Sequence, residues 1–331
     1  MSFTTNNRST GRLRASLRRR AALTAAVSAL GLYCAQAQAV SILFIGNSFT
    51  YGAGSDVQTY NPGSVTDLNG TGIGGVPALF KSFAVQAGLD YDVSLETQPG
   101  SNLDFHYDNR LGLISQAWDR VVMHGQSTLD FANPGDPTKI TTYANLLAQE
   151  FVSHNPAVEV NLMATWSRAD QTYLPTGHWY GQPISAMQAD VQAGYQQAAF
   201  ASPLVNDRLI KVGAAWNRAM EAGVADPNPY DGIAPGMVSL WADDEYHASQ
   251  YGSYLEALTI FGTLTGVDPR TLGASEQAAM DLGIAPDVAV GLQNVAYAQI
   301  TAIPEPSTWL LMGMGSVVLV FAARRRARPD A

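Results

Sequence analysis

Cysteine is almost absent from the chain, because Cys34 is the single one among 331 residues and lies in an N-terminal segment that we expect to be removed. The mature protein then has no thiol, which excludes disulfides, cysteine nucleophiles and cysteine-ligated metal sites. Basic residues are also scarce. Ten of the 19 Lys and Arg and two of the 28 Asp and Glu lie in the two ends, so the region between them carries 9 basic and 26 acidic residues, a net charge of −17. This net negative charge disfavours binding to nucleic acid or anionic lipid, and it favours a neutral or cationic ligand.

The N-terminal segment has the composition of a secretory signal. Five arginines between Arg12 and Arg20 precede an Ala-rich apolar run over 21–35, and Ala35-Gln36-Ala37 supplies a small-residue cleavage site. The apolar run is too short to span a bilayer comfortably. We therefore expect a signal peptide over residues 1–37 rather than a transmembrane anchor.

The C-terminal segment, residues 304–331, carries three ordered features. Pro304-Glu305-Pro306 is followed by an apolar run over 309–323 and then by Arg324-Arg325-Arg326. This order resembles the PEP-CTERM sorting signal of Gram-negative bacteria. The resemblance implies a short transmembrane helix, transient association with the inner membrane, and removal by an exosortase-type processing protease. We expect an exported protein that reaches the periplasm, the cell surface or the medium.

Residues 38–303 are long enough for one large domain. Their pattern of strand, loop and helix, repeated about five times, predicts a parallel sheet with helices on both faces. Segment 53–75 is polar and rich in glycine, which predicts a long loop beside the site. The expected strands are 41–45, 89–97, 120–123, 158–164 and 209–212. The expected helices are 76–87, 105–117, 140–154, 184–200, 214–222 and 249–265.

Polar clusters follow three of these strands, and a fourth precedes the last helix. They are Gly46-Asn47-Ser48, Gly100-Ser101-Asn102, His124-Gly125-Gln126-Ser127 and Asp244-Glu245-Tyr246-His247. The carboxyl ends of parallel strands meet at the edge where α/β proteins bind ligands, so we expect the clusters to converge. A nucleophilic serine needs an imidazole to take its proton and a carboxylate to orient that imidazole. The alternative for Ser48 is that it caps the helix or turn that follows.

The four clusters, in this order, resemble the sequence blocks of the SGNH (GDSL-like) hydrolase superfamily. The first block here has Asn47 where the family commonly has Asp, and the last has the pattern Asp244-x-x-His247. The resemblance implies a three-layer, flavodoxin-like α/β/α fold of SGNH-hydrolase type and no cofactor. It also implies Ser48 as nucleophile, His247 as base and Asp244 as the orienting carboxylate, with Asp243 as the rival for that last role.

The resemblance further implies an oxyanion hole. Its donors would be the backbone N–H groups of Ser48 and Gly100 and one side-chain amide. The third block departs from the family pattern because it has no Asn-Asp pair. Gln126 is therefore the candidate amide, and the ring of His124 is the alternative donor.

Aromatic residues near the strand ends suggest a substrate loop. Trp166, Trp179 and Tyr180 are the candidates, and the alternative is that they pack at the rim of the core. The histidines at 106, 154 and 178 lack the spacing of metal ligands, so no metal site is expected.

The function predicted from these patterns is an exported serine esterase. Its substrate would be an acylated small molecule or a glycan that carries O-acyl, in particular O-acetyl, groups. Two alternatives stay open, namely a non-catalytic carbohydrate- or matrix-binding protein on the same fold, and an O-acyltransferase that uses the same serine and histidine.

Overall fold

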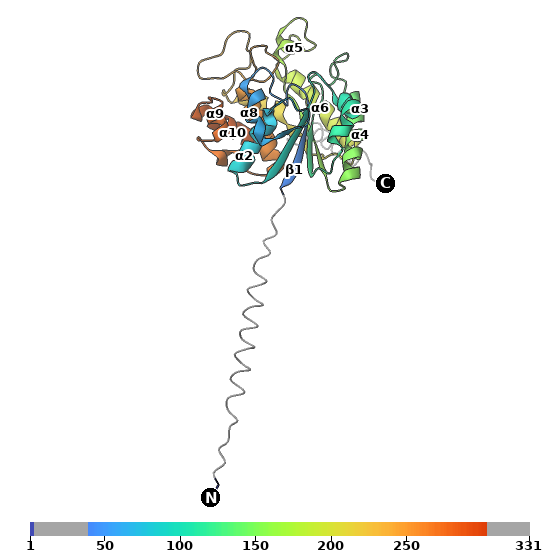
Figure 1. Ribbon diagram of the computed structural model, residues 1–331. Coiled ribbons are helices and arrows are strands. Elements are labelled where there is room, and N and C mark those ends of the chain that lie inside the picture. Colours follow the sequence, from blue (N-terminus) through green and yellow to red (C-terminus); the bar gives the residue numbers. More distant parts are fainter. Residues whose placement is uncertain (3–38, 303–331) are drawn as a thin grey trace, which may run out of the picture. The chain divides into compact units, whose positions relative to one another are not determined.

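A six-stranded parallel sheet forms the centre of the domain (Figure 1). The computed structural model describes residues 1–2 and 39–302, so the expected sorting signal and nearly all of the expected signal peptide lie outside the described residues. The strand order is β2-β3-β1-β4-β5-β6, and all neighbours are parallel. The strands are β1 (Val40–Gly46), β2 (Thr66–Asp67), β3 (Tyr91–Thr97), β4 (Arg120–Met123), β5 (Glu159–Ala164) and β6 (Ile210–Lys211).

The sequence predicts about five strands, and the sixth is β2. It lies inside segment 53–75, which was expected to be loop only, and pairs with the outer edge of β3. Two residues are too few to produce a two-residue period, so the hydrophobic pattern does not reveal this strand. Two short 3-10 turns, η1 (Asp56–Thr59) and η2 (Pro62–Ser64), precede it.

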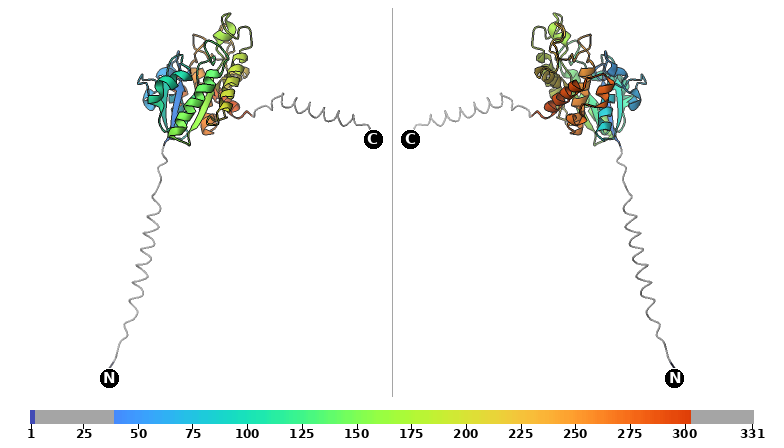
Figure 2. Two further views of the ribbon diagram at one scale, coloured as in Figure 1. Left: turned by 90° about the vertical axis from the view of Figure 1, so that its right-hand side faces the viewer. Right: turned by 90° about the vertical axis from the view of Figure 1, so that its left-hand side faces the viewer.

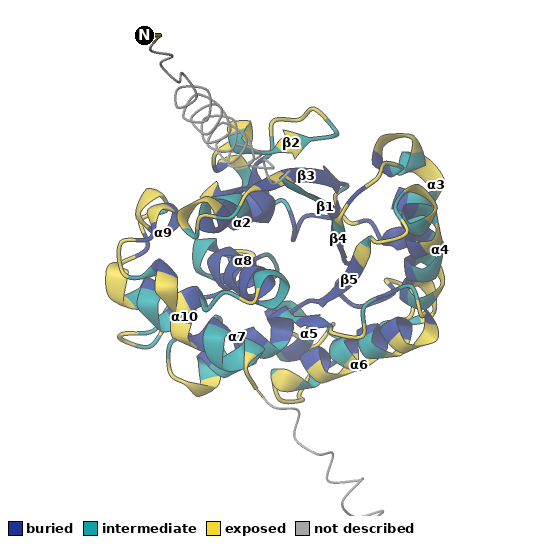
Figure 3. Cartoon of the chain, turned by 90° about the horizontal axis from the view of Figure 1, so that it is seen from below, coloured by how far each residue is buried: buried dark blue, intermediate teal, exposed yellow. Residues whose placement is uncertain are grey.

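Helices cover both faces of the sheet, as the strand–helix alternation predicts. Figure 3 shows α2, α7, α8 and α10 on one side and α3, α4 and α6 on the other, and the two views of Figure 2 look onto these opposite sides. The helices are α2 (Gly75–Gln86), α3 (Leu103–Ile114), α4 (Thr138–His154), α5 (Ala169–Tyr173), α6 (Ser185–Ala201), α7 (Val212–Glu221), α8 (Gln250–Thr265), α9 (Gln277–Asp281) and α10 (Pro286–Ile300), with a 3-10 turn η3 (Pro269–Leu272).

The central residues 42–45 of β1 are all apolar because both faces of the strand are buried. Ile42 and Phe44 pack into the core beneath α2, α7, α8 and α10, whereas Leu43 and Ile45 pack into the core beneath α3, α4 and α6. Side chains alternate between the faces of a strand, so a strand buried on both faces must be apolar at every position. The three-layer fold therefore follows from this run.

The end of the chain differs from the expected pattern, because α9 and α10 lie beyond the last predicted helix. None of the helices in the described part of the chain has the length and apolar character that crossing a bilayer requires. The carboxyl ends of the strands point toward α5 in Figure 1, and the polar clusters lie at that edge.

Candidate active site

The side chain of Asn47 holds three strand ends together. Its buried Nδ2 donates hydrogen bonds of 3.0 Å to the carbonyl oxygens of Ser101 and Gly125, which follow β3 and β4. Its Oδ1 accepts a hydrogen bond from the backbone N–H of Phe49. The predicted convergence of the first three clusters is therefore present. An aspartate here has no N–H to offer two carbonyl oxygens, which explains the asparagine in the first block.

Ser48 lies in a tight helical turn directly after β1. The N–H of Tyr51 donates to the Asn47 carbonyl, and the N–H of Ala53 donates to the Ser48 carbonyl. The Ser48 hydroxyl makes no hydrogen bond among the described residues, so it caps neither η1 nor α2, the next α-helix. The alternative role of a helix cap is thus not observed.

His247 is paired with Asp244. Its Nδ1 lies 2.6 Å from Asp244 Oδ2, and its backbone N–H donates to Asp244 Oδ1 at 2.9 Å. Partial burial opposes ionisation of Asp244, but hydrogen bonds from the His247 ring and from two backbone N–H groups outweigh it and lower the pKa of this carboxyl. Asp243 makes no such contact in the described structure. The geometry therefore selects Asp244 over its rival as the partner of the ring.

Ser48 and His247 are not hydrogen-bonded within the described structure, but the residue after Ser48 contacts the His247 ring. The ring of Phe49, next to Ser48, contacts the His247 ring edge-to-face, with 5.8 Å between the ring centres. With Nδ1 on the carboxylate, Nε2 is the nitrogen left to accept a proton. Hydrogen bonds of this kind are often long in the absence of substrate and shorten in the complex.

The prediction that Trp166 and Trp179 belong to a substrate loop is wrong. Both side chains are buried, with 0% and 1% of their surface exposed, so neither can stack on a ligand. Trp166 is stacked between Phe49 and Trp216, and the Trp179 indole donates to Asp190. The alternative role in core packing is correct for these two, while Tyr180 is 55% exposed.

The buried tryptophans instead hold the loop that carries His247. Trp166 Nε1 donates to the carbonyl of Tyr246 at 3.3 Å, and Trp241 Nε1 donates to the carbonyl of Ser167 at 3.0 Å. A backbone bond from Ala169 to the Glu245 carbonyl adds a third link. The loop after β5 and the histidine loop therefore form one unit that rests on the aromatic core.

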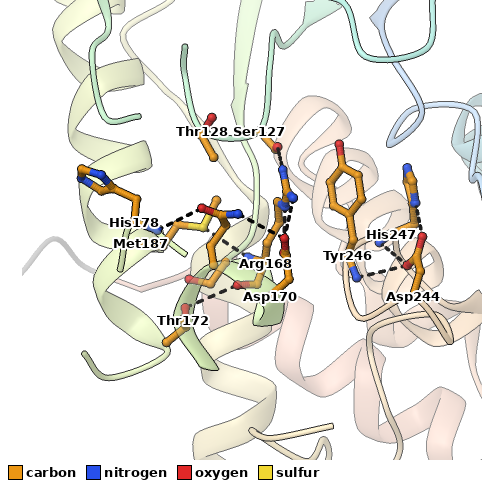
Figure 4. A network of polar contacts seen from close by, with 12 residues as sticks. Ser127, Thr128, Arg168, Asp170, Thr172, His178, Met187, Asp244, Tyr246 and His247 are labelled. Atoms are coloured by element: carbon orange, nitrogen blue, oxygen red, sulfur yellow. Dashed lines mark hydrogen bonds and ion pairs between the residues drawn. The ribbon is translucent and has the colours of Figure 1, made fainter. Parts of the chain in front are cut away.

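Arg168 joins this unit to the third cluster and was missed from the sequence. Its guanidinium forms two hydrogen bonds to Asp170 and one of 3.3 Å to the Ser127 hydroxyl, and it lies 3.7 Å above the Tyr246 ring (Figure 4). The short segment Trp166–Asp170 at the end of β5 was the signal available, but a lone arginine in a loop does not reveal its partners.

None of the three predicted oxyanion donors has a hydrogen-bond acceptor in the described structure. They are the backbone N–H of Ser48, the backbone N–H of Gly100 and Nε2 of Gln126. Gln126 Oε1 accepts from the N–H and hydroxyl of Thr128, which fixes the amide orientation and leaves Nε2 free. Three unused donors at adjoining strand ends are what a developing negative charge requires.

Gly100 is presented by a type II turn. The turn Gln98-Pro99-Gly100-Ser101 is closed by the Ser101 N–H on the Gln98 carbonyl, and Gly100 has φ +69°. Proline at the second position and glycine at the third are the residues that this turn demands.

A buried chain of polar groups braces this turn and was also missed. His106 Nδ1 contacts the carboxylate of Glu96, and its Nε2 lies 2.8 Å from the Ser101 hydroxyl, which itself donates to the Gln98 carbonyl at 2.9 Å. A hydroxyl has one hydrogen, so while Ser101 donates to the Gln98 carbonyl it can only accept from Nε2 of His106. In this arrangement the Ser-His-Glu chain supports the turn.

His124 is not available as the alternative oxyanion donor. Its Nδ1 donates to the Gly125 carbonyl at 2.9 Å, and its Nε2 accepts from the Thr50 hydroxyl at 2.7 Å. A Cβ on Gly46 would collide with both Thr50 and His124, which explains the glycine that ends β1. Complete burial lowers the pKa of His124 to about 4, although its bond to Gly125 works in the opposite direction.

Comparisons with known proteins agree with parts of this description. Residues 302–326 match the PEP-CTERM protein-sorting motif, as the sequence predicts. No curated protein matches the chain. The crystal structure of a DUF4886 family protein from Bacteroides uniformis is similar, with a TM-score of 0.55, 17% identity, and coverage of 82% of this chain and 99% of that one, which shows a shared fold.

Two further solved structures have lower similarity. One is a GDSL-like lipase from Parabacteroides merdae, with a TM-score of 0.46, 15% identity, and coverage of 69% of this chain and 95% of that one. The other is a family 3 carbohydrate esterase from Clostridium thermocellum, with a TM-score of 0.43, 16% identity, and coverage of 68% and 94%.

Replacing Asn47 by Asp should destabilise the protein. The change leaves two buried carbonyl oxygens without donors and adds a buried charge, so we expect the free energy of unfolding to fall by about 2–4 kcal/mol. Urea denaturation measures this, with Asn294→Asp on the exposed face of α10 as the matched control. Equal effects of the two substitutions would show that the amide does not hold the strand ends.

His124 should make stability depend on pH. The folded protein keeps the ring neutral down to about pH 4, whereas the unfolded chain protonates it near the ordinary pKa of 6.5. The stabilisation is therefore complete above pH 6.5 and is lost as the pH falls toward 4. From pH 7 to pH 5 we expect the parent to lose about 2 kcal/mol more unfolding free energy than His124→Gln. Parallel stability–pH curves for the two proteins would contradict this.

Proposed function

We propose that this protein is an exported serine ester hydrolase that acts through an acyl-enzyme intermediate. The observation that carries the proposal is the set of three unused hydrogen-bond donors beside a serine with a free hydroxyl and a His–Asp pair. Ser48, Gly100 and Gln126 follow the ends of three neighbouring strands, and in the proposed site their N–H groups would donate to the oxygen of the tetrahedral intermediate. The shared fold supports the proposal, as does the sorting motif for export.

In the proposed mechanism the Ser48 hydroxyl attacks the ester carbonyl. Nε2 of His247 takes the proton, and Asp244 on Nδ1 keeps the ring in the required tautomer and stabilises the imidazolium that forms. The carbonyl oxygen becomes an anion that accepts hydrogen bonds from the N–H groups of Ser48 and Gly100 and from Gln126. His247 then protonates the departing alcohol, which leaves the acyl group on Ser48.

Water completes the cycle in the same site. His247 removes a proton from the water, the hydroxide attacks the acyl carbonyl, and Ser48 departs with its proton restored. The products are a carboxylic acid and an alcohol, and no cofactor takes part. Replacing the water by a sugar hydroxyl would make the same residues an acyltransferase.

The proposed substrate is an O-acyl ester, in particular O-acetyl, on a carbohydrate. Export to the cell surface brings the protein to polysaccharides, and the net acidic charge of the body favours a substrate that is not an anion.

The triad can be tested with p-nitrophenyl acetate. We expect Ser48→Ala and His247→Ala to lower kcat at least about a thousandfold, because the nucleophile and its base act as one unit. Asp244→Asn should lower kcat by about a hundredfold or more, since the amide favours the wrong tautomer. Asp243→Asn is the matched control and should leave kcat unchanged.

An active parent that keeps its activity in Ser48→Ala would contradict the assignment of the nucleophile. A parent as inert as the variants toward this ester and toward acetylated glycans would favour the non-catalytic binding protein instead. Circular dichroism of each variant establishes that the fold is retained.

Gln126 has a separate prediction. Gln126→Ala removes one of the three donors and should lower kcat by about a hundredfold to a thousandfold with little change in KM, because the donor acts in the transition state. Gln116→Ala, at an exposed position, is the control. A variant that changes KM alone would assign Gln126 to substrate binding rather than to the oxyanion hole.

A further inference from the structure

A cavity opens directly beside the proposed oxyanion donors. It measures about 400 Å³, and both Gly100 and Gln126 line it. Its other walls come from α3 and the two residues before it, from the loop between β4 and α4, and from the first turn of α4. Neither Trp179 nor Tyr180 lines this cavity, so the sequence-based substrate loop is not part of it.

Two phenyl rings line the cavity. Phe131 is 85% exposed, the highest value for any aromatic side chain in the described part of the chain, and Phe105 is half-buried on α3. An exposed ring held over a polar hollow offers a flat apolar surface to one face of a ligand. Few apolar groups accompany these rings, so the cavity does not suit a long acyl chain.

The polar groups of the cavity are mainly hydrogen-bond acceptors. Asp104 and Asp108 lie one helical turn apart on α3, and Asn109 uses its Nδ2 on the Phe105 carbonyl, which leaves its oxygen to accept. Lys139 is the one cation of the lining and lies 3.1 Å from Asp130 and 3.8 Å from Asp104. Two carboxylates and one paired ammonium give the lining a net negative charge.

We propose that this cavity binds the sugar unit that carries the ester, and that the sugar is neutral or an amino sugar. The C–H face of the pyranose would lie on Phe131, and its hydroxyl or ammonium groups would donate to Asp104, Asp108 and Asn109. A uronic acid is disfavoured because its carboxylate would meet two carboxylates. This proposal rests on the proposed function, because the sugar lies next to the reacting ester only if Gly100 and Gln126 are the oxyanion donors.

Binding can be measured without turnover. Ser48→Ala protein is titrated with xylooligosaccharides, partly deacetylated chitooligosaccharides and oligogalacturonides in an isothermal calorimeter. We expect the first two to bind and the third not to bind. Adding Phe131→Ala should raise Kd by about fivefold, the loss expected for one aromatic contact. Phe200→Ala is the matched control, because Phe200 is 74% exposed and lines a different hollow on α6.

Binding of oligogalacturonides at least as tight as that of the other sugars would overturn the proposal, and so would the same Kd with and without Phe131. Absence of all three interactions would overturn it as well. Failure of the proposed function is distinguished by a separate assay, release of acetate from acetylated xylooligosaccharides by the parent. Sugar binding without acetate release would keep the subsite and reject the esterase.

Discussion

The amide of Asn47 is the interaction on which the rest of the site depends. Its two hydrogens meet two carbonyl oxygens from neighbouring strand ends, and no other short side chain offers this pair of donors. Ser48 follows it in the chain, while Gly100 and Gln126 are next to its two acceptors. The positions of the proposed nucleophile and of all three proposed oxyanion donors therefore depend on one buried group.

The aromatic side chains of the hydrophobic core extend up to the residues of the candidate site. Phe49, which follows Ser48 in the chain, stacks on Trp166. Trp166 also stacks on Trp216 and donates to the carbonyl of Tyr246, next to His247. A cavity made in this stack would lower stability, and we expect it also to move His247 relative to Ser48. The histidine loop has little regular structure of its own, and these aromatic contacts replace it.

Much of the fold followed from the sequence, because the strands are buried on both faces and the helices are amphipathic. The four clusters also identified the edge of the sheet where the site lies. Side-chain partners were harder to foresee, since Trp166, Arg168 and His106 act through residues far away in the sequence. Composition alone also did not distinguish the buried Trp179 from the exposed Phe131 as a ligand surface.

The described part of the chain holds a second serine–histidine–carboxylate set besides the proposed triad, and the two differ in how completely their hydrogen bonds are made. In the set of Ser101, His106 and Glu96 the hydroxyl and both ring nitrogens are engaged. In the proposed triad of Ser48, His247 and Asp244, the serine hydroxyl and one ring nitrogen have no partner among the described residues. Triad geometry alone would therefore favour Ser101 over Ser48. Free hydrogen-bonding capacity in the described structure, rather than completed hydrogen bonds, distinguishes the proposed nucleophile from the serine that supports the turn.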